Sequence, residues 1–289
     1  MRQFELITPS SKTEVLSLLG DNDSQIVAGG TGLLNLMKQR IANPARLISL
    51  HKIADLHRIE QVENMITIGA LVTLAEIERN KLIQELAPVI VETLREVANP
   101  RIRSMATMGG TLAHADPNQD TPVTLAALGG IVIVESVPRL RELALSALYR
   151  DHYETVLEPD EMITAIKIPI PLANHRIAFK KFTPASVEDY ACVTVCVRLK
   201  MVDNQCQSSH ILLGGVGPTI IKATSAEQVL KGRPVSVTIA DEAALAAARQ
   251  TEPMDDTRGS ADYKRRMVRV WVRRMILKAV GSNGKDIEI

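Results

Sequence analysis

Two glycine-rich segments hold the residues of this chain whose types and spacing could bind a charged ligand. The first, Ala28–Leu33, follows a short apolar run and precedes the helical pattern Leu33–Lys38. Glycines let a turn expose consecutive backbone N–H groups, and a following helix adds its positive dipole end, so the segment favours an anionic phosphate. Standard phosphate motifs do not match, because Asn35 stands where a dinucleotide fingerprint needs glycine and no Gly-Lys-Ser/Thr follows. Taken alone, such a segment is equally typical of a plain tight turn.

The second segment, Thr107–Thr111, is expected to form another glycine-rich loop and is followed by a polar run. Its two glycines permit close backbone approach, and the threonine at each end offers a hydroxyl group. His114, Asp116 and Asp120 resemble metal ligands, but three ligands packed around a proline would need an unusual loop, so no metal site is predicted. A polar surface loop is the alternative interpretation of this stretch.

The presence of both segments, some 80 positions apart, favours one ligand that uses both. A dinucleotide with a diphosphate at its middle, such as FAD, fits this arrangement. No histidine is paired with a serine or cysteine in a nucleophile motif, so no catalytic residue is predicted. That suits a flavoprotein, in which the flavin carries the electron chemistry and the protein positions it.

Composition excludes several other classes of protein. The 289 residues include 34 Lys plus Arg and 33 Asp plus Glu, a balance that argues against a nucleic-acid binder. The longest apolar run, Val123–Val134, is well short of the about 20 residues that a membrane span needs, and the N-terminus lacks the apolar region of a signal peptide. Three cysteines are too few for a disulfide framework or a four-thiolate iron–sulfur cluster. We therefore expect a soluble cytoplasmic protein with reduced thiols.

The elements that must position these segments differ between the two halves of the chain. In the first half, short strands and helices alternate, with strands predicted at 25–28, 46–50, 57–62, 65–69, 131–134 and 162–168, and helices at 12–19, 33–38, 82–97 and 122–128. In the second half, strands at 179–182, 191–198 and 208–213 precede helices at 225–230, 240–249 and 261–280. Strands first and helices afterwards favour an α+β domain, and Pro169 and Pro171 mark the best boundary between the halves.

Three segments in order carry a family resemblance that covers nearly the whole chain. Val27–Leu34, Thr107–Asp120 and Asp256–Met267 resemble the FAD-binding medium subunit of molybdenum hydroxylases, the xanthine dehydrogenase and carbon monoxide dehydrogenase family. The resemblance implies an α+β fold: a two-lobed FAD-binding domain of the PCMH type, followed by an α+β C-terminal domain. The expected bounds are 1–173, with a small lobe at about 1–55 and a larger lobe at about 56–173, and then 174–289.

The same resemblance assigns roles to individual residues. The first segment is expected to wrap the FAD diphosphate with backbone amides, and the second to approach from the other side. Asp120 is expected near the flavin ring or ribityl chain, Ile163 beside the cofactor, and Lys181 in contact with it. Gly32 and Thr111 depart from the residues common in the family, which affects side-chain contacts there but not backbone ones. The expected FAD-binding residues are Ala28, Gly29, Gly30, Thr31, Gly32, Leu33, Thr107, Gly109, Gly110, Thr111, Asp120, Ile163 and Lys181.

The function implied by the resemblance is that of a flavoprotein subunit within a larger oxidoreductase. Electrons would pass from a molybdopterin large subunit through the iron–sulfur clusters of a small subunit to FAD here, and then to an external acceptor, in a heterotrimer or its dimer. Two alternatives stay open: a self-contained FAD-dependent oxidoreductase, and a nonenzymatic nucleotide-binding module. The basic helix predicted at 261–280 is expected to face solvent or a partner rather than nucleic acid.

Overall fold

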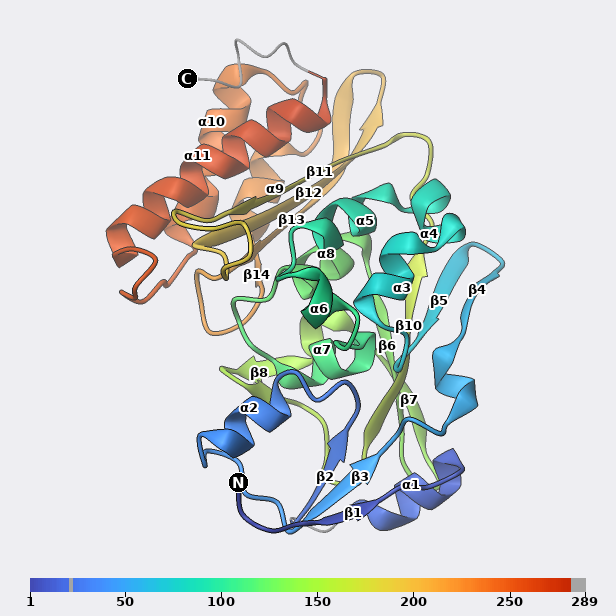
Figure 1. Ribbon diagram of the computed structural model, residues 1–289. Helices are drawn as coiled ribbons and strands as arrows, with labels where there is room; N and C mark the ends of the chain where they lie inside the picture. The colour runs from blue at the N-terminus through green and yellow to red at the C-terminus, as the bar shows by residue number, and fades with distance from the viewer. Residues whose placement is uncertain (21–22, 282–289) are drawn as a thin grey trace. The chain divides into compact units, whose positions relative to one another are not determined.

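The computed structural model describes residues 1–20 and 23–281, which divide into two compact units (Figure 1). Unit 1 comprises residues 1–85, 99–115 and 130–169, and unit 2 comprises residues 86–98, 116–129 and those from 170 onward. The predicted α+β fold is confirmed. The division into domains 1–173 and 174–289 stays a prediction. The two compact units are defined by contacts and are not continuous in sequence, because residues 86–98 and 116–129 are grouped with the C-terminal half. Within the described ranges, no helix combines the length and apolar character that crossing a membrane requires.

The N-terminal part of unit 1 is a parallel sheet of three strands in the order β1–β3–β2. The side chain of Ser11 accepts a hydrogen bond from the backbone N–H of Glu14 and so caps the first helix, which was predicted at 12–19. The first glycine segment connects β2 to α2 and therefore lies at the carboxyl end of a parallel strand, where ligands commonly bind. The elements are β1 (Glu5–Ile7), α1 (Lys12–Leu18), β2 (Ser24–Val27), α2 (Leu33–Lys38) and β3 (Arg46–Ser49).

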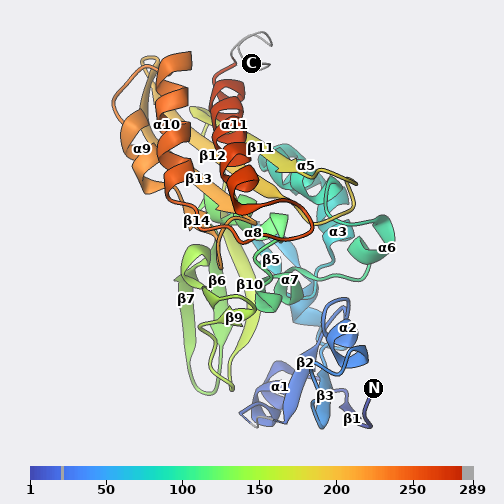
Figure 2. The same ribbon diagram turned by 90° about the vertical axis from the view of Figure 1, so that its left-hand side faces the viewer.

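The rest of unit 1 is built on an antiparallel sheet of five strands in the order β4–β5–β10–β6–β7. Figure 2 shows β6, β7 and β10 side by side, and the strands predicted at 57–62 and 65–69 form the antiparallel pair β4–β5. The strands are β4 (Ile59–Val62), β5 (Met65–Gly69), β6 (Ile131–Glu135), β7 (Leu140–Ala144) and β10 (Met162–Pro169). The shorter elements are η1 (Ala54–His57), α3 (Leu74–Arg79), α4 (Lys81–Leu86), α6 (Pro100–Arg103), α7 (Met108–His114), η2 (Leu145–Ala147), β8 (Tyr149–Asp151) and β9 (Glu154–Thr155).

Two sequence-based predictions about helices were wrong. The second glycine segment is not a loop but the start of α7, because the Thr107 side chain accepts a hydrogen bond from the Gly110 N–H and caps the helix. The single helix predicted at 82–97 is two helices, α4 and α5 (Pro88–Arg95), because Pro88 occupies the first turn of the second one.

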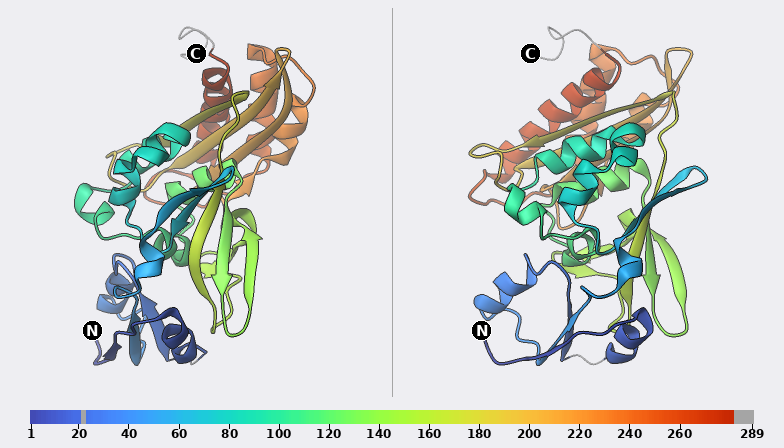
Figure 3. Two further views of the ribbon diagram at one scale, coloured as in Figure 1. Left: turned by 90° about the vertical axis from the view of Figure 1, so that its right-hand side faces the viewer. Right: turned by 45° about the vertical axis from the view of Figure 1, so that its right-hand side comes forward.

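Unit 2 contains an antiparallel sheet in the order β11–β12–β13–β14 with helices packed on both faces (Figure 3). Successive side chains of β12 point to opposite faces of the sheet. Val193, Val195 and Val197 lie on the face that forms a core with the C-terminal helices. Thr194 and Arg198 lie on the other face and hydrogen-bond to α8. Helices α9, α10 and α11 cover one face, and α5 and α8 contact the same sheet through β11, β12 and β13. The elements are α8 (Asp120–Leu128), β11 (His175–Phe182), β12 (Val193–Val202), β13 (Gln205–Gly214), β14 (Ile221–Lys222), α9 (Thr224–Leu230), α10 (Val237–Arg249) and α11 (Ala261–Ala279).

Candidate functional site

The first glycine segment presents a row of unused hydrogen-bond donors. The backbone N–H groups of residues 29–33 have no hydrogen-bond partner among the described residues. Gly30 has φ +70°, and Gly32 has φ −86° and ψ −58°, so left-handed and right-handed backbone occur within three residues. Such alternation makes a concave nest of N–H groups that binds anions. The segment is half-buried, so its donors are only partly available to water.

The two glycine segments lie against each other within unit 1. A Cβ added to Gly110 would be 4.0 Å from the Cβ of Ala28. A Cβ added to Gly32 would be 3.1 Å from two ring atoms of His114, in the helix that the second segment begins. Unit 1 therefore brings the two glycine segments together, while their shared binding of one ligand stays a prediction.

In the second glycine segment, the backbone N–H groups of residues 108–111 already donate hydrogen bonds within the protein, so this segment can offer a ligand a surface but no free backbone donors. The N–H groups of Met108 and Gly109 donate to the carbonyl oxygens of Val72 (2.9 Å) and Ala70 (2.8 Å). The N–H groups of the next two residues, 110 and 111, both donate to Thr107, to its hydroxyl and carbonyl oxygens respectively. Because these donors are used, an anion beside the two segments would find its backbone donors in residues 29–33.

The segments keep glycine for different physical reasons. A Cβ on Gly109 would stand 2.6 Å from the Cβ of Ala70, so this glycine allows α7 to pack closely behind β5. Gly110 is exposed, and the nearest atom to an added Cβ is the Thr107 hydroxyl at 2.9 Å. Of the two, only Gly110 presents a bare backbone to solvent, as a surface approached by a ligand would.

Ile163 also belongs to unit 1. It lies in β10, pairs with Val134 of β6 and is 5% exposed. A β-bulge follows it before Ala165, so the strand is irregular at this position. An apolar side chain here agrees with the expected role beside a cofactor, which stays a prediction.

Asp120 and Lys181 form a buried ion pair within unit 2. Asp120 is the first residue of α8; one carboxylate oxygen lies 3.2 Å from Lys181 Nζ, and the other accepts a hydrogen bond from the Thr194 hydroxyl. Burial raises the pKa of Asp120 to about 6, although Lys181 and Thr194 both act to lower it. The preceding residue, Gln119, has a buried side-chain oxygen without a partner in the part of the chain described, an acceptor that a ligand hydroxyl or N–H would satisfy.

His114 is a site neighbour that the sequence analysis considered only as a metal ligand. Its ring lies against Gly32 and makes an edge contact with Tyr153, with ring centroids 5.4 Å apart. Within the described ranges, no three His, Cys, Asp or Glu side chains gather as metal ligands would. The sequence offered one signal for this contact, the glycine at position 32, where the family often has a larger residue. Because Gly32 has no side chain, the ring of His114 can lie against it.

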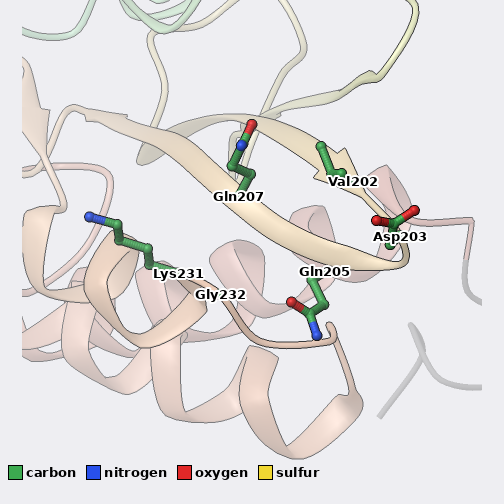
Figure 4. A pocket seen from close by; sticks show the side chains of 6 residues that line it. All are labelled: Val202, Asp203, Gln205, Gln207, Lys231 and Gly232. Carbon is green, nitrogen blue, oxygen red and sulfur yellow. The ribbon is translucent and has the colours of Figure 1, made fainter.

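An open hollow elsewhere in unit 2 shows little capacity for chemistry. It lies at the β12–β13 hairpin, and Figure 4 shows its two charged side chains, Asp203 and Lys231, at opposite ends. The other lining residues are Val202, Gln205, Gln207 and Gly232. None of the residues predicted to bind FAD lines this hollow, so we do not assign it to the cofactor.

Comparison with known proteins gives matches over both halves of the chain. Residues 2–171 match the family model described as the FAD binding domain in molybdopterin dehydrogenase, and residues 177–279 match the CO dehydrogenase flavoprotein C-terminal domain. The carbon monoxide dehydrogenase medium chain of Afipia carboxidovorans is 33% identical, over 96% of both chains. The nicotine 6-hydroxylase medium subunit of Paenarthrobacter nicotinovorans is 34% identical, over 94% of this chain and 95% of that subunit.

Solved structures agree with these relatives. The chain resembles one in the reconstituted CO dehydrogenase from Oligotropha carboxidovorans, with a TM-score of 0.93, 33% identity and coverage of 98% of this chain and 100% of that one. It also resembles one in quinoline 2-oxidoreductase from Pseudomonas putida 86, with a TM-score of 0.91, 31% identity and coverage of 96% and 97%. In each of these comparisons the similarity therefore covers nearly the whole of both chains.

Proposed function

Because the chain belongs to the family of FAD-binding subunits of molybdopterin dehydrogenases, we propose that it is the subunit through which a molybdenum hydroxylase delivers electrons to an external acceptor. Its cofactor is FAD, as the two glycine segments predicted, and it is an oxidoreductase subunit. The finer steps, namely the source of the electrons, their acceptor and the residues that hold FAD, make up the proposal.

The single observation that supports the site most directly is the row of N–H groups at residues 29–33 that have no partner in residues 1–20 and 23–281. A diphosphate carries negative charge and oxygen atoms that can accept hydrogen bonds from these N–H groups. The segment therefore fits the diphosphate at the middle of FAD. We assign Ala28–Leu33 to the diphosphate and the surface of Thr107–Thr111 to the adjoining wall. Ile163 would give an apolar contact, and Asp120 would lie near the flavin or its ribityl chain.

When bound, FAD supplies the ability to take up electrons and to pass them on. The protein residues hold and orient it. The nest offsets the charge of the diphosphate. No catalytic side chain is assigned, in keeping with the absence of a nucleophile motif in the sequence.

The partners are proposed from what this chain lacks. Its three cysteines, Cys192, Cys196 and Cys206, are free and buried, and burial raises the pKa of Cys196 to about 12, which disfavours the thiolate needed to bind iron. Several relatives are named as medium chains or medium subunits. We therefore assign the iron–sulfur clusters to a small subunit and the molybdopterin to a large one. Reduced thiols also agree with the cytoplasmic location predicted from the sequence, which remains part of the proposal.

Purification from the organism that encodes the chain, followed by subunit identification and metal analysis, tests this proposal. We expect iron, molybdenum and two further subunits to co-purify with the chain. The isolated chain, fully loaded with FAD, should oxidise no organic substrate at an appreciable rate. Turnover by the isolated chain equal to that of the native preparation would establish the self-contained oxidoreductase instead, and a preparation that neither retains nor takes up FAD would indicate a nonenzymatic module.

A further inference from the structure

The ammonium group of Lys181 is unusual in being fully occupied inside unit 2. The residue is 3% exposed, and its Nζ donates to the carbonyl oxygens of Glu96 (2.7 Å) and Val187 (3.1 Å) and lies 3.2 Å from a carboxylate oxygen of Asp120. A lysine ammonium has three N–H donors. With three acceptors around it, Lys181 has no donor left for a ligand, and any contact with FAD would involve its aliphatic stem.

The three acceptors come from three separate segments of unit 2. Glu96 ends α5, Asp120 begins α8, and Val187 lies in the connection between β11 and β12, residues 183–192. Burying a charge is costly unless it is paired and hydrogen-bonded, so these contacts must form together for the lysine to remain buried. Lys181 thus joins the first turn of α8 to the connection 183–192.

The connection is also held from its outer side. The Arg258 guanidinium lies 3.6 Å from a carboxylate oxygen of Asp189 and 5.3 Å from the ring centre of Tyr190. Val187, whose carbonyl oxygen bonds to Lys181, has a side chain that is 62% exposed. The side chains of residues 184–188 are exposed, whereas Ala191 and Cys192 at the end of the connection are buried, and Lys181 holds the backbone at Val187 from inside.

We propose that Lys181 is a positioning residue, which acts on the flavin through the carboxylate of Asp120 and the connection 183–192 and not by donating a hydrogen bond to FAD. This inference rests on the proposed location of Asp120 beside the flavin. The groups that face Asp120 are Lys181 from β11, the Thr194 hydroxyl from β12 and, more distantly, the acidic Glu96 from α5. Removing the lysine leaves the carboxylate with one hydrogen bond and a like charge nearby, so its protonated form becomes favoured over a wider pH range.

The test compares Lys181→Met with Lys181→Arg in the full chain loaded with FAD. Lys180→Met is the matched control, because Lys180 is the adjacent residue but lies on the opposite side of the strand, 5.5 Å from the ring centre of Trp271. Three quantities are measured: the pH midpoint of the flavin absorbance change, the hydrogen exchange of the amides in 183–192, and the dissociation constant of FAD.

Lys181→Met should raise the pH midpoint by one unit or more and speed exchange in 183–192 about tenfold or more, with the FAD dissociation constant changed less than fivefold. Lys181→Arg should restore most of both properties, and Lys180→Met should resemble the wild type. If Lys181→Met fails to fold, Thr194→Val provides the second variant: it removes the hydroxyl from the other carboxylate oxygen and should raise the midpoint without faster exchange.

Two results would overturn the inference. One is a loss of FAD affinity of 100-fold or more with the pH midpoint and exchange unchanged, which would mean direct contact with the cofactor. The other is a flavin whose pH response is the same in the wild type and in every variant. Failure of the proposed function is distinguishable, because it would be seen in the wild type as independent substrate turnover or as absence of FAD.

Discussion

The backbone carbonyl oxygen of Met105 occupies the space in which a side chain on Gly29 would begin. A Cβ built on Gly29 would be 1.8 Å from that oxygen, and its next contact is the carbonyl carbon of the same residue. Both residues belong to unit 1, one in the first glycine segment and the other just before α7. Gly29 is therefore needed for one segment to pack on the other, whether or not a ligand is present.

Gly29→Ala should destabilise unit 1 in the absence of FAD. Backbone atoms cannot yield to a Cβ at this distance as a flexible side chain can, so the segment must shift, at a cost of about 1–3 kcal/mol or more. Urea unfolding of the FAD-free protein, compared with the wild type, measures the loss. An unchanged unfolding midpoint would show that the segments can separate freely.

Gly30→Val should abolish FAD retention. The residue has φ +70°, which a β-branched side chain rarely adopts, and the new Cβ would be 2.9 Å from Leu34 Cδ1. The nest would be distorted at its centre. Flavin absorbance per chain after gel filtration gives the occupancy.

Gly232→Val separates strain from ligand contact in this experiment. Gly232 has φ +71°, close to that of Gly30, but an added Cβ meets no atom within 4 Å. Both variants should lose about 1–2 kcal/mol of stability through the strained backbone. Full flavin occupancy in Gly30→Val would show that the first segment does not bind FAD. An equal loss of flavin occupancy in Gly30→Val and Gly232→Val would show the same.

Asp120→Asn should remove a pH dependence of stability. The pKa of Asp120 is raised in the folded chain from 3.8 to about 6, so between these values the folded state binds more protons than the unfolded state. The stability that the protonated carboxyl provides is complete below pH 3.8 and is lost as pH rises through 6. The unfolding free energy of the wild type, minus that of Asp120→Asn, should fall over this range by on the order of 3 kcal/mol. Denaturation of the FAD-free proteins from pH 4 to pH 7 measures this difference; a difference that rises with pH would contradict it.

Ala115→Gly and Gly129→Ala should have opposite effects on stability. Both residues end a helix in the left-handed conformation, with φ 53° at Ala115 after α7 and φ 86° at Gly129 after α8. Glycine is favoured there because it has no Cβ to crowd the backbone. We expect a gain of up to about 1 kcal/mol for Ala115→Gly and a loss of about 1 kcal/mol for Gly129→Ala. Thermal unfolding checks both, and a loss in each would mean that the buried Ala115 methyl group contributes more than the strain removes.

The sequence by itself determined the features that depend on neighbours along the chain. The helices predicted at 12–19 and 33–38 and the strand predicted at 191–198 depend on interactions within one element or along one strand, so residue types and spacing suffice to predict them. The two glycine segments and their FAD ligand were predicted in the same way. Pro88 also carried a local signal, as a residue that begins a helix, but the prediction ran one helix, 82–97, straight through it.

Only the tertiary structure decided which groups remain available for binding. The N–H groups of Met108 and Gly109 donate to carbonyl oxygens of Val72 and Ala70, whereas those of residues 29–33 find no acceptor in the part of the chain that the structure describes. Nothing in the glycine content of the two segments predicts this difference. The family resemblance implied that Lys181 contacts the cofactor, but its three donors are occupied by acceptors 6, 61 and 85 positions away in the sequence. A hydrogen-bonding group is free or used according to what folding places opposite it, and pairs this far apart in sequence are fixed by the packing of whole elements and not by local pattern.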